Sequence, residues 1–228
     1  MPRLPRSSPL RRRLFRLYDA LHRRFGPQRW WPARSTLEVV VGAILAQSTA
    51  WVNVERALSR LRAAGALRLG VLREISAREL ATLVRASGFF RVEARRLRGF
   101  FRHLARHHRG NLRRFLRQPA VALRAELLSI PGIGPETADS ILLYAAGRPV
   151  FVVDGYTRRI LSRHRIVAPD ADYDALQALL TANLPRDPAL FNEYHALLVR
   201  LAKEYCRTIP RCERCPLRFD LGGRSPRL

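Results

Sequence analysis

The sequence predicts an all-α protein built from two helical domains. Apolar residues recur every three to four positions along most of the chain, which is the period of one face of an α-helix. The sequence contains no alternating pattern typical of a β-strand and no repeat of useful length. Two of the apolar stretches flank Pro131-Gly-Ile-Gly-Pro135, a tight-turn sequence, so the predicted elements include a helix-hairpin-helix motif.

The predicted helices follow one another with short connections. The first spans 10–25, carries arginines on its polar face and ends before Gly26-Pro27. The second spans 36–47, is strongly apolar and has Ser35 as its N-cap. Further amphipathic helices are predicted outside the hairpin at 52–61, 77–86, 92–104, 111–116, 156–161, 173–184 and 188–205.

The order of these elements suggests how the domains are divided. We expect residues 35–148 to form a six-helix type of bundle that holds the hairpin at 123–146. Residues 1–34 and 149–217 would form the second helical domain, with a cleft between the two domains. Residues 218–228 would form a basic tail, and the composition of residues 221–228 predicts that this part is disordered.

The charge of the chain favours a polyanionic partner. It has 42 Lys and Arg against 18 Asp and Glu, a formal net charge of +24, and neutralising phosphates with such charges releases counterions. A GC-rich genome would also raise the arginine content, but the charges act on nucleic acid whatever their origin. The sequence has no apolar run of about 18 residues and no signal-like leader. We expect a cytoplasmic, nucleoid-associated monomer.

The hairpin carries the features of a phosphate-binding turn. Gly132 and Gly134 allow a tight turn with positive φ, and Ile133 would plug the space between the two helices. Pro135 suits the first turn of the second helix. Backbone N–H groups at such a helix start can bind a phosphate without reading sequence. An ordinary αα-hairpin would account for the glycines equally well.

Three segments resemble the endonuclease III superfamily of DNA glycosylases. They are Leu128-Ser-Ile-Pro-Gly-Ile-Gly-Pro-Glu-Thr-Ala-Asp139, Val152-Val-Asp-Gly-Tyr-Thr157 and Gly42-Ala-Ile-Leu-Ala-Gln-Ser-Thr49, and the resemblance covers about residues 10–217. It implies an enzyme that flips a damaged base out of double-stranded DNA into the cleft and cuts its glycosidic bond. In this family a glutamine fills the vacated stack. The DNA-binding residues that it implies are Gln47, Gly132, Ile133, Gly134, Glu136 and Thr137.

Asp154 is the candidate catalytic residue. It follows an apolar run and precedes a predicted helix, so it reads as an N-cap whose carboxylate the helix dipole keeps ionised. A carboxylate beside a flipped nucleotide can stabilise an oxocarbenium-like sugar and orient water. Asp154 stands 18 positions after Glu136, which matches the place of the family's catalytic aspartate.

Glu136 departs from the pattern of the bifunctional relatives. Enzymes of the family that also break the strand carry a lysine there, whose amine forms a Schiff base with the sugar. A glutamate cannot form one, so the resemblance implies a monofunctional glycosylase with little lyase activity. The adenine-mismatch branch carries an acid in the helix before its glutamine, and residues 39–46 contain none.

Trp30-Trp31-Pro32 resembles a feature of the 3-methyladenine glycosylases within the superfamily. Electron-rich aromatic rings can stack on a methylated purine and favour its positive charge, so these residues are a candidate substrate pocket. They would also serve as a hydrophobic plug between domains. Two other functions stay open: an endonuclease III-like glycosylase and AP lyase for oxidised pyrimidines, and a non-catalytic DNA-binding protein. His195 receives no role.

The three cysteines stand together as Cys206, Cys212 and Cys215. They resemble the iron–sulfur loop of the family, which implies a [4Fe–4S] cluster, but Phe219-Asp220-Leu221 stands where the fourth cysteine belongs. Asp220 or an outside ligand could complete the cluster, zinc could replace it, or the loop could be metal-free. Its basic residues, which would contact phosphate or simply face solvent, are Arg207, Arg211 and Arg214.

Overall fold

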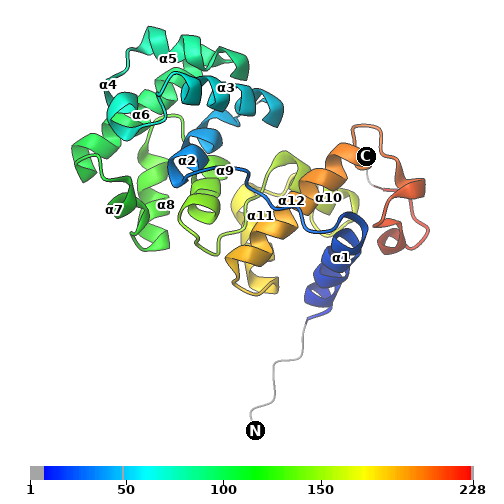
Figure 1. Ribbon diagram of the computed structural model, residues 1–228. Coiled ribbons are helices and arrows are strands. Elements are labelled where there is room, and N and C mark those ends of the chain that lie inside the picture. The colour runs from blue at the N-terminus through cyan, green and yellow to red at the C-terminus, as the bar shows by residue number, and fades with distance from the viewer. Residues whose placement is uncertain (1–7, 48, 227–228) are drawn as a thin grey trace. The chain divides into compact units, whose positions relative to one another are not determined.

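The computed structural model describes residues 8–47 and 49–226 (Figure 1). Throughout this described part the regular secondary structure is helical, without a strand, which confirms the predicted all-α class. Residues 1–7 of the predicted second domain, Ser48 of the glutamine motif and residues 227–228 of the predicted tail lie outside the described residues. Among the described helices, none combines the length and the apolar character that a membrane span requires.

The chain folds into two compact units. The first unit contains both ends of the chain, residues 1–30 and 149–228, and the second unit is the continuous segment 31–148. The hairpin therefore belongs to the second unit, whereas Asp154 and the cysteines belong to the first.

The second unit is a bundle of short helices around the nearly all-buried helix α2. From Val39 to Leu45 the residues of α2 are buried, so this helix is surrounded by its neighbours. The longest helix, α6, buries Leu97, Phe100 and Leu104 along one face. The helices of the unit are α2 (Thr36–Leu45), α3 (Trp51–Ala63), α4 (Leu69–Glu74), α5 (Ala77–Leu83), η1 (Arg85–Ser87), α6 (Phe90–His108), α7 (Leu112–Leu116), α8 (Ala120–Ser129), α9 (Pro135–Ser140) and the π-helical η2 (Ile141–Ala145).

The start and end of α2 fix the position of Gln47. As predicted, Ser35 is the N-cap, since its hydroxyl accepts a hydrogen bond from the Glu38 N–H at 3.2 Å. The Glu38 carboxylate in turn accepts the N–H of Arg34 at 2.9 Å, which closes the first turn. The helix ends at Leu45, two residues earlier than predicted, so Gln47 lies in the turn that follows it.

The first unit is organised around α12. Its helices are α1 (Pro9–Phe25), α10 (Gly155–Arg163), α11 (Tyr173–Asn183), α12 (Pro188–Glu204), η3 (Cys212–Arg214) and η4 (Arg218–Leu221). α12 packs against both α1 and α10. Tyr194 of α12 is almost fully buried, and its hydroxyl donates to the carbonyl oxygen of Leu14 at 2.9 Å. The aromatic ring thus contributes apolar area to the core while its polar atom keeps a partner.

The segment predicted as a tail begins with ordered structure. The Asp220 carboxylate binds the Arg13 guanidinium with two contacts of 2.7 Å and the His164 ring at 2.8 Å. Leu221 is only 6% exposed. Residues 218–221 are therefore a 3-10 helix that is fastened to α1 and the end of α10. The prediction of disorder rested on the glycine, serine, proline and arginine content of residues 221–228, and the buried Leu221 is the residue at which it differs from the structure.

Candidate functional site

The hairpin turn joins α8 to α9 and leaves two glycines exposed. Gly132 has φ of +88°, the left-handed conformation that favours glycine. Gly134 has φ of −91° and ψ of 177°, which any residue can adopt, so the positive φ that the two glycines were predicted to allow is used at Gly132 alone. A Cβ built on Gly134 would meet no atom within 4 Å. The space in front of Gly134 is therefore open to an approaching ligand.

The residues around the turn divide into buried and exposed ones. Ile133 and Thr137 are each 5% exposed, so their side chains belong to the core of the second unit and only their backbone could reach DNA. Glu136 is exposed in the first turn of α9, directly after Pro135 at the first helical position. The exposed surface of the hairpin turn thus consists of the two glycines, the two prolines and the Glu136 side chain.

Gln47 lies beside the hairpin turn. Its side-chain Nε2 donates a hydrogen bond to the carbonyl oxygen of Gly132 at 3.1 Å. The second unit therefore brings together two of the predicted DNA-contacting features, although 85 positions separate them in the sequence.

A buried ion pair fastens the two helices of the hairpin to each other. Arg124 of α8 binds both oxygens of Asp139 of α9, at 2.8 and 3.2 Å. The Asp139 side chain is fully buried, while that of Arg124 is 25% exposed. A two-pronged guanidinium–carboxylate pair fixes orientation as well as distance, so it holds the angle at which the turn is presented.

Three aromatic side chains form a group beside α2. The Trp31 ring lies 4.6 Å from that of Trp51 at 78° and 4.9 Å from that of Tyr144 at 36°. A Cβ on Gly42 would come within 3.3 Å of the Trp31 ring, so the glycine lets this ring approach α2 closely. Trp31, Trp51 and Tyr144 are all partly exposed. Sequence reasoning missed the last two.

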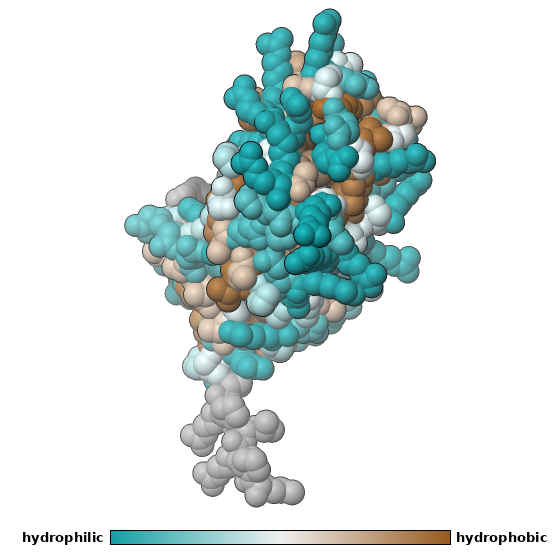
Figure 2. Space-filling model, turned by 90° about the vertical axis from the view of Figure 1, so that its left-hand side faces the viewer, coloured by the Kyte–Doolittle hydropathy of each residue, from teal (hydrophilic) through white to brown (hydrophobic). Residues whose placement is uncertain are grey.

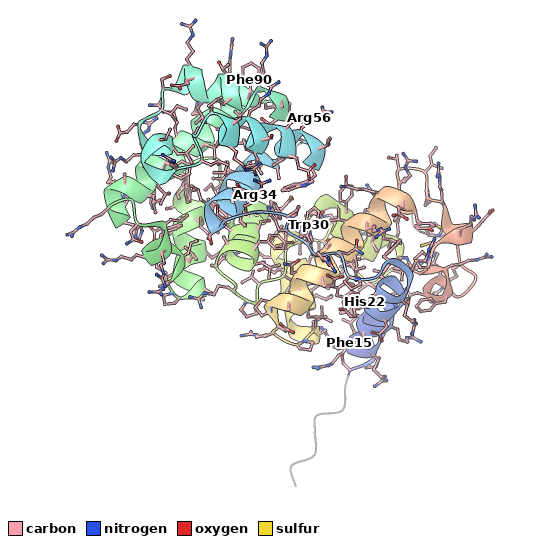
Figure 3. The ribbon with its side chains drawn as sticks, viewed as in Figure 1. Phe15, His22, Trp30, Arg34, Arg56 and Phe90 are labelled. Atoms are coloured by element: carbon pink, nitrogen blue, oxygen red, sulfur yellow. The ribbon has the colours of Figure 1, made fainter. Side chains whose placement is uncertain are left out.

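The two adjacent tryptophans fall in different units. Trp30 ends the first segment of the first unit, and Trp31 begins the second unit. Both lie, with the exposed Pro32, in the segment that joins α1 to α2, where Figure 3 labels Trp30. Of the predicted pocket residues, the second unit therefore holds Trp31 and Pro32, and the structure adds Trp51 and Tyr144 beside Trp31.

Arginines line two grooves on either side of α6. One, of about 820 Å³, lies between α5 and α6, and the other, of about 1010 Å³, lies between α6 and the hairpin turn at Pro131 and Gly132. Arg95 and Arg102 border both. Figure 2 shows long hydrophilic side chains over much of the face that it presents, with apolar patches between them. Sequence reasoning missed the surface, whose signal is the helical spacing of Arg91, Arg95, Arg98 and Arg102.

Asp154 is the N-cap of α10, as predicted. Its Oδ1 accepts the N–H of Thr157 at 2.7 Å, and its Oδ2 lies 3.6 Å from Nε2 of His195 on α12. The side chain is 13% exposed. Burial acts to raise the pKa of Asp154, but the hydrogen bond and charge of His195 and the hydrogen bonds from Thr157 outweigh it and bring the pKa below its ordinary value.

His195 is a site residue that sequence reasoning missed. Its side chain is 7% exposed and faces Asp154 from a different helix of the first unit. No local sequence pattern predicts this pair. The two residues lie on α10 and α12, and they meet only when these helices pack against each other. Their arrangement keeps a carboxylate ionised and oriented within a largely buried environment.

The three cysteines line one small cavity of about 10 Å³ in the first unit, which holds roughly one water molecule. Leu221 and Arg163 line the same cavity, and Arg163 donates to the Cys206 sulfur at 3.4 Å and to the carbonyl oxygens of Arg207 and Thr208. Burial, together with the other two thiols, raises the pKa of Cys215 to about 11 despite a hydrogen bond from Leu217.

This donor set does not fit a [4Fe–4S] cluster. Such a cluster takes four thiolates, and an apolar Leu221 and a guanidinium stand beside the three thiols here. Asp220, considered above as a fourth ligand, is held by Arg13 and His164. The arginines of the loop are nevertheless available to phosphate, because Arg207, Arg211 and Arg214 are exposed.

A family model supplies the comparison that identifies the chain. The model described as HhH-GPD superfamily base excision DNA repair protein matches residues 41–186, which include the second half of α2, the hairpin and Asp154. This chain belongs to the HhH-GPD superfamily. It is a base-excision repair DNA glycosylase of that superfamily.

Known members of the superfamily resemble the chain over most of its length. A protein of Methanocaldococcus jannaschii named as a DNA repair glycosylase is 41% identical over 206 residues, which cover 90% of this chain and 94% of the relative. The 3-methyladenine DNA glycosylase MagIII of H. pylori, solved with 1,N6-ethenoadenine, is 27% identical with a TM-score of 0.72, over 84% of this chain and 97% of that one. An endonuclease III–DNA complex shares the fold at 20% identity, with a TM-score of 0.78 over 92% and 94% of the two chains.

Proposed function

We propose that this glycosylase is a monofunctional enzyme that removes alkylated purines, such as 3-methyladenine, from double-stranded DNA. The observation that carries the proposal is the ionised carboxylate of Asp154, held by Thr157 and His195 in a chain whose hairpin has Glu136 at the place of the lyase lysine. Similarity to MagIII, which was solved with a modified adenine, supports the choice of lesion. The enzyme would act as a monomer.

Asp154 supplies the negative charge that the reaction needs. As the C1′–N bond of the flipped nucleotide breaks, both electrons leave with the base and positive charge develops on the sugar. The Asp154 carboxylate stabilises that charge and orients a water molecule, whose oxygen bonds to C1′ and whose proton is released. His195 acts as a positioning residue, because it holds Asp154 without being required to touch the sugar.

The aromatic group selects the base. An alkylated purine carries a positive charge, so it is already a good leaving group and needs little help from an acid. The faces of Trp31, Trp51 and Tyr144 attract a cation through their negative π-electron density. An aromatic pocket therefore favours a cationic purine over its neutral parent, with Pro32 of the same unit as a further lining residue.

DNA would be held without reading its sequence. The N–H groups at Gly132 and Gly134 bind one phosphate, and Gln47 fills the space that the flipped base leaves. The arginines that line the two α6 grooves, with those of the cysteine loop, would contact further phosphates.

The alternative substrate class is oxidised pyrimidines, which the structural similarity to endonuclease III favours. An enzyme of that kind would also cut the strand through a Schiff base. Borohydride reduction in the presence of abasic DNA traps such an adduct covalently. We expect no trapped complex, and a trapped complex would contradict the monofunctional assignment.

Substitution of the catalytic carboxylate provides the central test. Asp154→Asn keeps an N-cap side chain for Thr157 but removes the negative charge, so the fold should persist while base release falls by about 10³-fold or more. The measurement is single-turnover release of bases from methylated and from oxidised DNA. Asp172→Asn is the matched control, because Asp172 caps α11 in the same way through the Ala175 N–H at 2.6 Å.

The outcomes separate the candidate functions. The proposal is supported if the wild type and Asp172→Asn release bases from methylated DNA but not from oxidised DNA, and if Asp154→Asn has lost this activity. Release from oxidised DNA instead would move the enzyme to the other substrate class. A wild-type protein that binds DNA and releases no base from either substrate would contradict catalysis altogether.

A further inference from the structure

A cluster of two histidines and one glutamate lies in the second unit, apart from every residue discussed above. His103 and His108 come from the last part of α6, and Glu126 comes from α8. The Nε2 atoms of both histidines face the same carboxylate oxygen, Oε1 of Glu126, at 2.7 and 2.6 Å. The cluster therefore links α6 to the first helix of the hairpin.

The donor atoms of the cluster converge as metal ligands do. Within residues 8–47 and 49–226 it is the one group of three His, Cys, Asp or Glu side chains whose ligand atoms all lie within 4.8 Å of one another. Zinc takes imidazole nitrogen and carboxylate oxygen at about 2.0–2.2 Å, so ligand atoms around it stand roughly 3.3 Å apart. The present contacts would have to lengthen by roughly 0.6 Å, which side-chain rotation can supply.

A second polar side chain orients the carboxylate. Gln118 donates from Nε2 to Oε2 of Glu126 at 2.7 Å and to the carbonyl oxygen of Phe115 at 3.2 Å. This contact occupies one carboxylate oxygen and turns the other toward the histidines. Metal-binding carboxylates commonly have such a partner behind them, which fixes the geometry of the ligand.

The charge and the access of the cluster also suit a cation. Glu126 supplies a carboxylate, which is ordinarily negatively charged at neutral pH and so attracts a cation. The three side chains are 13–21% exposed, and His103 borders the open groove beside the hairpin. A small ion can therefore reach them from solvent.

We propose that His103, His108 and Glu126 bind a divalent transition-metal ion, with Zn²⁺ the natural occupant and water in the remaining coordination position. Two imidazoles and one carboxylate favour zinc over magnesium, which prefers oxygen ligands alone. An ion at this place connects α6 to α8 and so stabilises the support of the hairpin. The alternative is a hydrogen-bonded cluster that needs no ion.

The test measures zinc directly on the full chain. The protein is stripped with a chelator, kept reduced, and titrated with Zn²⁺ by calorimetry, with thermal unfolding followed with and without the ion. The variants are Glu126→Gln and His103→Gln, and the control is His107→Gln, since His107 is exposed on the same helix. The wild type and the three variants all keep the three cysteines. Any zinc bound by thiols therefore contributes equally to the zinc content of each protein.

We expect wild type and His107→Gln to bind one more zinc ion per chain than either cluster variant. Zn²⁺, but not Mg²⁺, should raise their unfolding temperature by several degrees more than that of the variants. Circular dichroism identifies a variant that has not folded, in which case the other variant decides. Equal zinc content and equal thermal shifts in wild type and a folded cluster variant would overturn the proposal.

Discussion

The two glycines of the hairpin turn differ in what a side chain would disturb: the backbone conformation and the neighbouring atoms at one position, and neither at the other. Gly132 has positive φ, and its added Cβ would lie 2.7 Å from Cγ of Arg96. Gly134 has neither restriction, since its φ is ordinary and the volume before it is empty. A ligand that approaches the backbone closely is the remaining reason for a glycine at 134.

This difference gives a prediction at the residue scale. Gly132→Ala should lower the free energy of unfolding by about 1 kcal/mol or more, because alanine is strained at positive φ. Gly134→Ala should leave stability unchanged but weaken DNA binding by about tenfold, equivalent to about 1.4 kcal/mol. Chemical denaturation and fluorescence anisotropy with the same duplex measure the two effects. Wild-type affinity in Gly134→Ala would mean that no phosphate approaches this backbone.

Individual site residues could be predicted when their role depends on sequence neighbours. The caps formed by Ser35 and Asp154 are such cases, because an N-cap bonds to a backbone N–H two or three positions later. His195 and Tyr144 could not be predicted, since their partners lie on other helices. The sequence also did not show which of the two turn glycines has positive φ, because a glycine can be used either for its backbone conformation or for its lack of a side chain.

At the scale of elements, the apolar period located most helices to within a few residues. The helices predicted at 52–61 and 188–205 correspond to α3 and α12. The short helix α4 was missed because its six residues make too few turns to display a period and include Gly70. The end of α6 at His108 also lay beyond the predicted 104, since polar residues continue the helix there.

The contact between α1 and η4 leads to a prediction about how the stability of the fold depends on pH. Asp220 is 2% exposed and pairs with Arg13 and His164. Although burial acts to raise its pKa, these partners bring the pKa of Asp220 well below its ordinary value. A carboxyl group whose pKa is lower in the folded state stabilises the fold fully above its unfolded value, about 3.9, and this contribution is lost as the pH falls below it.

Asp220→Asn should therefore cost about 3–5 kcal/mol at neutral pH, because it leaves Arg13 without its buried counter-charge. The difference from wild type should shrink as the pH is lowered from about 5 toward 3. Urea unfolding at several pH values measures it, and the exposed Asp170, as Asp170→Asn, serves as the control. A difference that is independent of pH would show that the ion pairs contribute nothing.

At the scale of the whole molecule, the charge predicts how DNA binding responds to salt. Each arginine that neutralises a phosphate adds roughly 0.9 to the slope of log affinity against log salt. Replacing Arg95 and Arg102, which border both grooves of α6, with glutamine should reduce that slope by roughly 1–2. Arg186→Gln in the first unit, an exposed arginine outside the grooves, is the control. An unchanged slope in the double variant would remove these grooves from the DNA-binding surface.

The order of the two units along the chain has a consequence for synthesis. The segment 31–148 is complete on the ribosome while the first unit still lacks α10, α11 and α12. Because domains tend to fold as they emerge, the unit that we propose to bind phosphate forms first, and Asp154 gains its contact with His195 only later in synthesis. On the proposed function, a nascent chain stopped near residue 150 would bind DNA but would lack the carboxylate that cleaves the glycosidic bond.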